Sequence, residues 1–382
     1  MKVLYVTHGA DMMGANKSLL DLIMGLQAYD VESVLLIPED GELSEYLTKK
    51  GIPYIKAFYY NWAFTKYISK GYWLNNIRQK QNQTHLKAIA EKVRDLNFDL
   101  IYSNSSIIGI GAQLADYLTI PHIWRIREFG EKDYGVSFWG GRQMFNKWAN
   151  KSAAITTISK AIEKETLTEV SAPKYVIFDG IINRKELDSI RPNSCHDKDP
   201  FVFLIIGLIH PTKRQLVALR AFHKVHMKNP NTKLLIVGKG RRLYTKKIKN
   251  YIKKNGLENA ANFVGYTKEP YKYHEQADCV LMCSKSEGMG RVTIEGMIFG
   301  NPVIGFNGGA TPELVQHNKN GLIYSKGEDE LAECMLSLVS DRKKAAEYGR
   351  VGRKEAEKYL IEYSSLKEYQ LFQEILKKKT AN

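Results

Sequence analysis

Short apolar stretches alternate with amphipathic ones along almost the whole chain, and this alternation limits the possible folds more than any other feature. In the first half, apolar runs are separated by segments whose apolar residues recur at helical spacing. Strands that alternate with helices form right-handed βαβ units and a parallel sheet. The sequence therefore predicts an α/β fold. The expected strands of this half cover residues 2–8, 31–38, 99–105, 121–129, 153–159 and 174–181, and the expected helices cover 16–29, 41–51, 84–98, 108–120 and 160–170.

The alternation stops at residues 183–200, a polar segment with two prolines, and then resumes. A chain of 382 residues exceeds the usual ceiling for a single hydrophobic core. We therefore predict two doubly wound, Rossmann-like domains that face each other across a cleft. The predicted boundaries are a first domain at 1–182, a linker at 183–200, a second domain at 201–360, and a last helix at 361–382 that can pack back on the first domain.

The composition is that of an ordinary soluble globular protein. Apolar residues make up 44% of the chain and charged residues 25%, which are usual proportions. No apolar run approaches the roughly 18 residues that are needed to span a bilayer, and residues 1–17 are typical of a strand and a turn, not of a signal peptide. Because Cys195, Cys279, Cys283 and Cys334 lack metal-ligand spacing, and so few cysteines fit a reducing compartment, we expect a cytoplasmic protein.

The net charge of +15 is unusual, and it predicts attraction to an anionic partner. Residues 56–94 contain eight basic residues and one acidic residue, and residues 241–254 contain seven basic residues and no acid. The first cluster has no nucleic-acid-binding motif, so we expect no nucleic-acid partner. Two interpretations of it stay open: peripheral contact with the anionic inner face of the cell membrane, or a domain core with solvated lysines. The aromatic residues within it are Phe58, Tyr59, Tyr60, Trp62, Phe64, Tyr67, Tyr72 and Trp73.

Residues 284–297 combine a strand end, a glycine-rich loop and the start of a helix. Gly288 and Gly290 allow the backbone to approach an anion closely, and the amides at a helix N-terminus face such an anion with positive partial charge. Glu287 can accept hydrogen bonds from sugar hydroxyls, and Glu295 can hold the vicinal hydroxyls of a ribose. Ligands of open α/β sheets bind at the carboxyl ends of the strands. We therefore predict a site for a nucleotide-diphosphate sugar, with a simple surface turn as the alternative.

The same segment carries a family resemblance. The stretch EGMGRVTIE, residues 287–295, resembles the Glu-x7-Glu motif of the retaining family 4 glycosyltransferases, of the bacterial surface-polysaccharide type. Residues 300–324 resemble the family's Gly-x-Pro-Val strand, its Gly-Gly…Pro-Glu loop and its Asn-Gly-Leu turn, and residues 234–240 resemble the strand before its Gly-x-Gly turn. The match covers most of the C-terminal half and is patchy over the N-terminal half. It implies the GT-B fold, with residues 1–182 binding the acceptor and 201–360 binding the nucleotide sugar.

The resemblance also implies roles on the donor side. Lys213, six residues after Gly207, stands where the family places a lysine that grips the donor diphosphate and stabilises the leaving group. An ordinary solvated lysine is the alternative. Leu208 replaces a frequent family arginine, so Arg214 or His210 would substitute, or Lys213 and helix amides would hold the diphosphate alone. The implied donor-binding residues are Gly14, His210, Arg214, Gly238, Gly288, Met289, Gly290, Arg291 and Glu295.

Residues 7–18 resemble the family's N-terminal Gly-Gly-Ala-Glu loop. Met13 and Asn16 replace the first glycine and the glutamate, and Gly14 is retained. The resemblance places this loop under the donor phosphates and beside the acceptor, which makes Asn16 a predicted acceptor-side residue. The alternative is a strand-to-helix turn that needs Gly14 for its backbone angle.

Arg127 stands where many relatives carry a histidine near the sugar, and Glu128 stands where an aspartate is common. An arginine does not act as a base near neutral pH, but it can hold a phosphate or an acidic acceptor. Arg127 is therefore predicted as a catalytic residue, with Glu287 and Lys213, and Glu128 as an acceptor-side residue. His122, two residues into the same strand, is expected in the core.

The implied reaction is a retaining hexosyl transfer from a UDP- or GDP-sugar to a hydroxyl of a glycan, lipid-linked or protein-linked acceptor. No residue is placed as a covalent nucleophile, so we expect front-face attack assisted by the departing phosphate. Asp197–Asp199 has the form of a metal-binding Asp-x-Asp but lies in the predicted linker, so we expect no metal or other cofactor. The alternative is a non-catalytic glycosyltransferase-like subunit, which Leu208 and Arg127 keep open and Glu287, Glu295 and Lys213 oppose.

Overall fold

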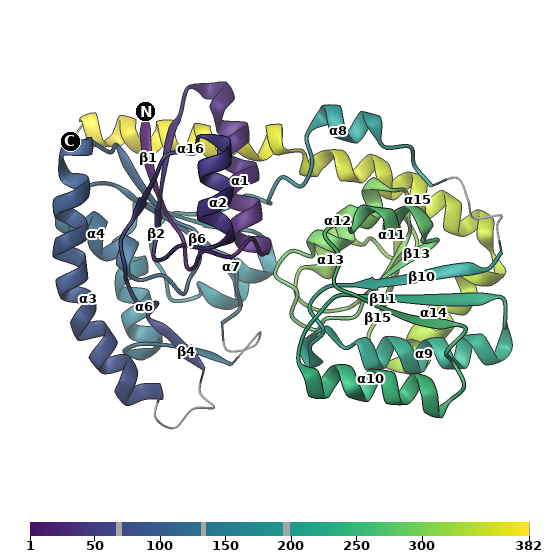
Figure 1. Ribbon diagram of the computed structural model, residues 1–382. Coiled ribbons are helices and arrows are strands. Elements are labelled where there is room, and N and C mark those ends of the chain that lie inside the picture. Colours follow the sequence, from purple (N-terminus) through teal and green to yellow (C-terminus); the bar gives the residue numbers. More distant parts are fainter. Residues whose placement is uncertain (66–70, 131–134, 194–198, 382) are drawn as a thin grey trace. The chain divides into compact units, whose positions relative to one another are not determined.

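The computed structural model describes residues 1–65, 71–130, 135–193 and 199–381. They form two compact units, unit 1 with Met1–Ile182 and Ile361–Asn382, and unit 2 with Asn183–Leu360 (Figure 1). Each unit is built around a parallel sheet with helices alongside it, so the predicted α/β architecture of two Rossmann-like domains is confirmed.

Unit 1 follows the strand-and-helix alternation that its sequence predicts. Its main strands are β1 (Lys2–Val6), β2 (Glu32–Ile37), β3 (Tyr54–Lys56), β5 (Leu100–Ser103), β6 (His122–Ile126), β8 (Ala154–Thr157) and β9 (Lys174–Val176). Its helices are α1 (Gly14–Leu26), α2 (Glu42–Lys50), α3 (Gly71–Val93), α4 (Ile110–Leu118), α6 (Gly141–Ala149), α7 (Lys160–Thr166) and α16 (Ile361–Ala381).

The seven strands described for this sheet run parallel in the order β3-β2-β1-β5-β6-β8-β9. The central strand β1 is apolar almost throughout because both of its faces are covered. Val3 and Tyr5 pack with residues of α1 and α16, whereas Leu4 and Val6 pack with residues of α3 and α4. The C-terminal helix α16 is thus part of the core of unit 1 and lies along α1 (Figure 1).

Unit 2 repeats the arrangement on a second core. Its strands are β10 (Phe201–Ile206), β11 (Thr232–Val237), β12 (Ala261–Gly265), β13 (Cys279–Met282), β14 (Val303–Phe306) and β15 (Gly321–Tyr324). Its helices are α8 (Arg184–Ser189), α9 (Gln215–Lys228), α10 (Arg242–Lys254), α11 (Tyr271–Gln276), α12 (Arg291–Ile298), α13 (Thr311–Leu314), α14 (Glu328–Ser340) and α15 (Arg342–Ala356). The six strands described for its sheet are parallel, in the order β12-β11-β10-β13-β14-β15.

The segment predicted as a linker is partly structured. Residues 183–193 include α8, and the side chain of Asn193 donates to the carbonyl oxygen of Ala277 at 2.6 Å, so this part packs within unit 2. Cys195 and Asp197 of this segment, like Tyr67 of the basic stretch, lie outside the described residues. Among the helices of the described chain, none is long and apolar enough to cross a membrane.

Candidate active site

The predicted donor-side residues of unit 2 follow the carboxyl ends of its strands. Because β10, β11, β13 and β14 are parallel, the loops after them lie at one edge of the sheet. Gly207 and Gly238 bring two of these loops together. A Cβ on Gly238, whose φ is +142°, would lie 1.8 Å from the carbonyl oxygen of Gly207, so only glycine fits there.

Lys213 and Glu287 meet at this edge. Lys213 ends the 3-10 helix η3 (Pro211–Lys213) after β10, and Glu287 lies in the loop after β13. Their Nζ and Oε2 atoms are 2.6 Å apart, and both side chains are partly exposed. A charged lysine that solvent reaches, fixed beside a carboxylate, can bind an anionic ligand and a hydroxyl-bearing ligand side by side.

His210 and Arg214 flank Lys213 and hold its loop. The imidazole of His210 accepts a hydrogen bond from the backbone amide of Thr212. Burial, together with Arg241 and Lys213, lowers the pKa of His210, which keeps the ring neutral near pH 7. Arg214 donates to the carbonyl oxygen of Cys283 at 3.3 Å and lies over the ring of Phe306 at 4.6 Å. Arg214 therefore links the loops after β10, β13 and β14.

The glutamate loop is shaped by two glycines. Gly290, with φ +86°, caps the N-terminus of α12, and the amide of Ala310 donates to the carbonyl oxygen of Glu287 at 2.8 Å. A Cβ on Gly309 would lie 2.5 Å from the backbone nitrogen and oxygen of Glu287. The predicted glycine-rich anion loop thus begins a helix, as expected, with Gly288 and the buried Met289 directly before its cap.

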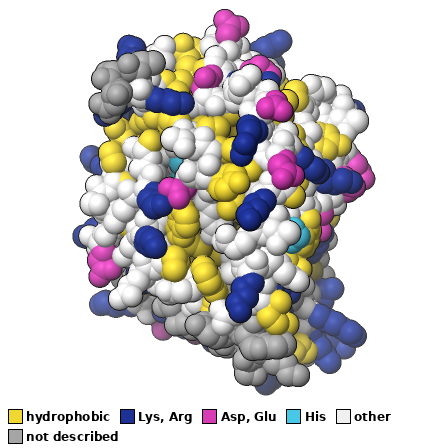
Figure 2. All heavy atoms as spheres, turned by 90° about the vertical axis from the view of Figure 1, so that its left-hand side faces the viewer, with side chains coloured by type: hydrophobic (Ala, Val, Ile, Leu, Met, Phe, Trp, Pro, Cys, Tyr) yellow, Lys and Arg dark blue, Asp and Glu magenta, His cyan; other side chains and the backbone are white. Residues whose placement is uncertain are grey.

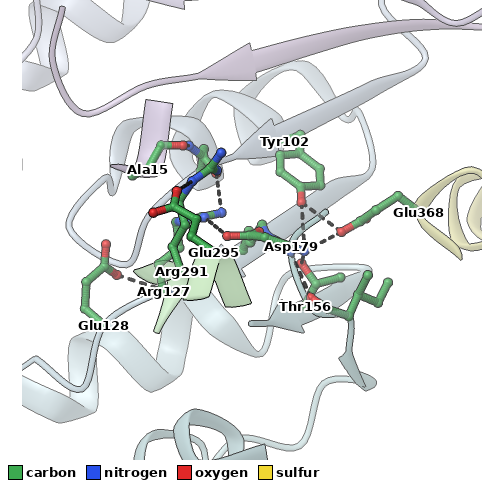
Figure 3. Close-up of polar contacts among 12 residues, drawn as sticks. Ala15, Tyr102, Arg127, Glu128, Thr156, Asp179, Arg291, Glu295 and Glu368 are labelled. Atoms are coloured by element: carbon green, nitrogen blue, oxygen red, sulfur yellow. Dashed lines mark hydrogen bonds and ion pairs between the residues drawn. The ribbon is translucent and has the colours of Figure 1, made fainter. Parts of the chain in front are cut away.

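Glu295 lies one helical turn beyond the start of α12 and is 5% exposed. Arg291, four residues earlier, donates to its Oε1 through Nε at 3.1 Å (Figure 3). The Nε2 atom of the buried His274 is 3.6 Å from Oε2, which is too long for a hydrogen bond. The carboxylate is therefore held in place by Arg291, with a polar ring behind it.

The N-terminal loop of unit 1 is held by its own side chains. Gly14 is the first residue of α1, and a Cβ added to it would have no atom within 4 Å. Its φ is outside the left-handed region. The alternative that the backbone angle of Gly14 requires glycine is therefore wrong. Asn16 is fully buried, and its Nδ2 donates to the carbonyl oxygens of Gly9 at 3.1 Å and Asp11 at 2.8 Å. The predicted acceptor-side role of Asn16 stays a prediction, and the contacts observed are structural.

Arg127 and Glu128 are both engaged within unit 1 (Figure 3). The guanidinium of Arg127 forms an ion pair with Asp179 and donates to Asn104 Oδ1 at 3.2 Å. Glu128 accepts hydrogen bonds from the hydroxyl of Ser105 and from both the hydroxyl and the amide of the next residue, at 2.6–3.1 Å. In this arrangement Arg127 positions Asp179 and Asn104, and Glu128 fixes the loop after β5 through its hydrogen bonds to Ser105 and Ser106.

His122 lies in the core, as expected. It bridges the hydroxyls of Ser103 and Ser152 at 2.9 and 2.8 Å, and burial lowers its pKa to about 3. Its ring is therefore neutral at physiological pH.

Sequence reasoning missed the partners of the predicted residues. Asp179 and His274 gave no local signal, because each lies far along the chain from its neighbour in the structure, Arg127 and Glu295 respectively. Gly309 lies in the Gly-Gly loop of the family resemblance, but its contact with Glu287 could not be predicted. One signal was present: Arg125 is a charged residue in the middle of an apolar strand, and a buried arginine requires a partner.

The fold resembles that of known proteins over nearly its whole length. The crystal structure of HepE from Anabaena in complex with UDP aligns with a TM-score of 0.79, covers 98% of this chain and all of its own, and is 19% identical. The two Rossmann-like domains and this structural similarity show that the chain has the GT-B fold.

Sequence comparison finds similarity to glycosyltransferases. Residues 187–355, within unit 2, match the family model described as "Glycosyl transferases group 1". An uncharacterized glycosyltransferase of Haemophilus influenzae is 27% identical over 286 residues, which are 72% of this chain and 76% of the relative. A GDP-mannose-dependent alpha-(1-6)-phosphatidylinositol monomannoside mannosyltransferase of Mycobacterium tuberculosis is 32% identical over 164 residues, which are 40% of this chain and 42% of the relative.

Proposed function

We propose that this protein transfers a hexosyl group from a UDP- or GDP-sugar to a hydroxyl of a glycan, lipid-linked or protein-linked acceptor, with retention of the anomeric configuration. The observation that carries the proposal is the pairing of Lys213 with Glu287 at the carboxyl edge of the unit 2 sheet. The pairing places the positive charge of Lys213, which can bind a diphosphate, next to the carboxylate of Glu287, which can bind a sugar.

In the proposed mechanism, Lys213 and the amides at the start of α12 stabilise the diphosphate as the glycosidic bond breaks. Glu287 orients the sugar through its hydroxyls, and Glu295 holds the ribose. The acceptor hydroxyl attacks on the face that the diphosphate leaves, and the departing phosphate takes its proton. Because Lys213 and the amides of α12 supply positive charge to the diphosphate, we expect turnover to persist in the presence of a metal chelator.

Two known proteins support a nucleotide-sugar donor without selecting its base. HepE binds UDP in its crystal structure, whereas the mycobacterial relative is named for GDP-mannose. We therefore keep both donor classes in the proposal.

We further propose peripheral contact with an anionic membrane surface on the cytoplasmic side. The basic stretch at residues 56–94 divides between core and surface: Tyr59 and Trp62 are buried, whereas Phe58 is 48% exposed. On α3, Leu74 and Ile77 are also exposed. The face of the molecule in Figure 2 carries hydrophobic side chains in yellow among lysine and arginine side chains in dark blue. Such a surface suits a headgroup layer, where rings and aliphatic groups insert and cations meet anionic lipid.

A thermal-shift screen with UDP, GDP, ADP and their common sugars tests the donor proposal. A ligand that binds only the folded state raises stability, by about 2.7 kcal/mol at a hundredfold excess over its Kd. We expect one nucleotide to stabilise the wild type and the exposed-site control Glu275→Ala, and to stabilise Glu295→Ala much less. If no nucleotide raises the Tm of the wild type, the non-catalytic alternative replaces the enzyme.

A further inference from the structure

A fully buried arginine in unit 1 binds two carboxylates that come from distant parts of the chain. Arg125, on β6, has a side chain only 2% exposed. Its NH2 atom is 2.7 Å from Oδ1 of Asp179, in the loop after β9, and its NH1 atom pairs with Oε1 of Glu368, on α16. The hydroxyl of Tyr102 donates to the same glutamate oxygen at 3.1 Å. One side chain thus joins three segments of unit 1.

Two of these segments are the ones that connect unit 1 to unit 2. The chain leaves unit 1 after Ile182 and returns at Ile361. The amide of Ile361 donates to the carbonyl oxygen of Ile182 at 2.9 Å, and a Cβ on Gly180 would lie 2.4 Å from the Cα of Ile361. We call these two connections, after Ile182 and before Ile361, the crossings. They lie side by side where they join unit 1. Arg125 holds both, because Asp179 precedes the first crossing and Glu368 follows the second.

The network continues from the crossings to the N-terminal loop (Figure 3). Asp179 binds Arg127 with its second carboxylate oxygen. Arg127 donates to Oδ1 of Asn104 at 3.2 Å, and Nδ2 of Asn104 donates to the carbonyl oxygen of Ala15 at 3.0 Å. Ala15 lies in the first turn of α1, between Gly14 and Asn16. A continuous series of polar contacts therefore runs from α16 to the first turn of α1, in the segment that the family resemblance places under the donor phosphates and beside the acceptor.

Stability alone does not explain charged groups at these positions. Apolar residues of similar volume often stabilise a core at least as well as a buried ion pair, whereas removal of one partner leaves a charge uncompensated. Two guanidinium groups face two carboxylates here, so each member depends on the positions of the others. Such a network specifies one geometry, and the geometry that it fixes is that of the crossings relative to the N-terminal loop.

We infer that a positioning relay sets the first turn of α1, at Gly14–Asn16, according to the position of the two crossings. The relay consists of Arg125, Asp179, Arg127, Glu368 and Asn104. The inference rests on the proposed function. It assigns Arg127 a positioning role through Asn104, in place of direct contact with the substrate. The proposed function assigns the main contacts to the diphosphate and the ribose to Lys213, the amides of α12 and Glu295 in unit 2, so we expect the relay to change turnover much more than nucleotide affinity.

Asn104→Ala tests the relay most directly, because it breaks the link to Ala15 and leaves all four charged groups in place. Glu368→Gln tests the α16 end, and Glu374→Gln is its matched control, since Glu374 is an exposed glutamate of the same helix that pairs with Lys378. The readouts are the Kd of UDP or GDP and the kcat and KM for the nucleotide sugar that the wild type uses.

We expect Asn104→Ala and Glu368→Gln to lower kcat about tenfold or more, since a small misplacement of a reacting group has effects of this size. The Kd of the nucleotide should stay within about twofold of the wild type, and Glu374→Gln should match the wild type in both. Unchanged kcat in both relay variants would overturn the inference, as would a parallel loss of kcat and nucleotide affinity.

Hydrogen exchange separates this inference from the proposed function. If the wild type neither binds a nucleotide nor turns over a donor, the proposed function fails and the relay is still tested by amide exchange in the first two turns of α1. Exchange there should be faster in Asn104→Ala and Glu368→Gln than in Glu374→Gln. Equal exchange in the three variants would contradict the relay on its own.

Discussion

Gly309 determines where Glu287 can lie. It has φ +55°, and its missing Cβ leaves room for the backbone of Glu287. Gly309→Ala should cost the roughly 1–2 kcal/mol of a left-handed alanine and should also displace the glutamate loop, with loss of donor turnover. Gly256→Ala is the matched control, because Gly256 has φ +63° but no atom within 4 Å of its added Cβ. Urea unfolding and turnover of both variants check this; equal turnover in the two variants would contradict it.

His122 makes the stability of unit 1 sensitive to acid. Its folded-state pKa is lowered from 6.5 to about 3 by burial, so its stabilisation is complete above pH 6.5 and is lost as the pH falls through about 3. The pKa difference corresponds to roughly 4 kcal/mol by pH 3. We expect His122→Gln to show a shallower fall in unfolding free energy between pH 6.5 and 3 than the wild type. If the unfolding free energies of the two proteins fall in parallel with pH, the His122 ring does not contribute to the acid sensitivity of unit 1.

At the scale of elements, α16 is a core helix of unit 1 although it ends the chain. Phe372 is fully buried and packs near Tyr102, with ring centroids 6.0 Å apart. Phe372→Ala should lower the unfolding free energy by about 3–5 kcal/mol. Tyr363→Ala, at an exposed position of the same helix, should change it by less than about 0.5 kcal/mol. Urea unfolding measures both; similar small effects would show that α16 is not part of the core.

The sequence predicted the long, periodic elements and missed the short or polar ones. Most strands of both main sheets follow apolar runs, and α12 follows the glycine loop, because periodicity reports burial directly. The short edge strands β3 and β15 were not predicted as strands. The pair of β4 (Ala63–Thr65) and β7 (Val136–Phe138) was missed since three residues are too few to show a period. The first turns of α3 were missed because residues 74–83 are mostly polar and exposed.

The same limit applies to the site. Glu287, Glu295 and Lys213 could be predicted because each lies in a motif of consecutive residues. The contacts of Gly309 with Glu287 and of Asn104 with Arg127 join distant segments, which a single sequence does not show.

At the scale of the whole molecule, the net charge of +15 predicts salt-dependent binding to vesicles that contain anionic lipid. Each basic residue near such a surface contributes about 1 kcal/mol. Arg78→Glu with Lys80→Glu, on α3, should therefore lower vesicle binding by at least about tenfold. The matched control is Lys246→Glu with Lys247→Glu, an equal charge change on the exposed face of α10. Co-sedimentation with vesicles of anionic and neutral lipid measures both; an equal loss would point to net charge, not to the α3 face.

Donor turnover tests the central claim most directly. Release of UDP or GDP from a panel of nucleotide sugars should be measured for the wild type, Lys213→Met and Lys228→Met, the last at an exposed lysine of α9. A charge-assisted hydrogen bond contributes about 1.5–3 kcal/mol. We therefore predict that the wild type and Lys228→Met release nucleotide from one donor class, and that kcat/KM of Lys213→Met is at least about tenfold lower. Equal kcat/KM in all three proteins, or no turnover of any donor by the wild type, would contradict the proposed glycosyl transfer at this site.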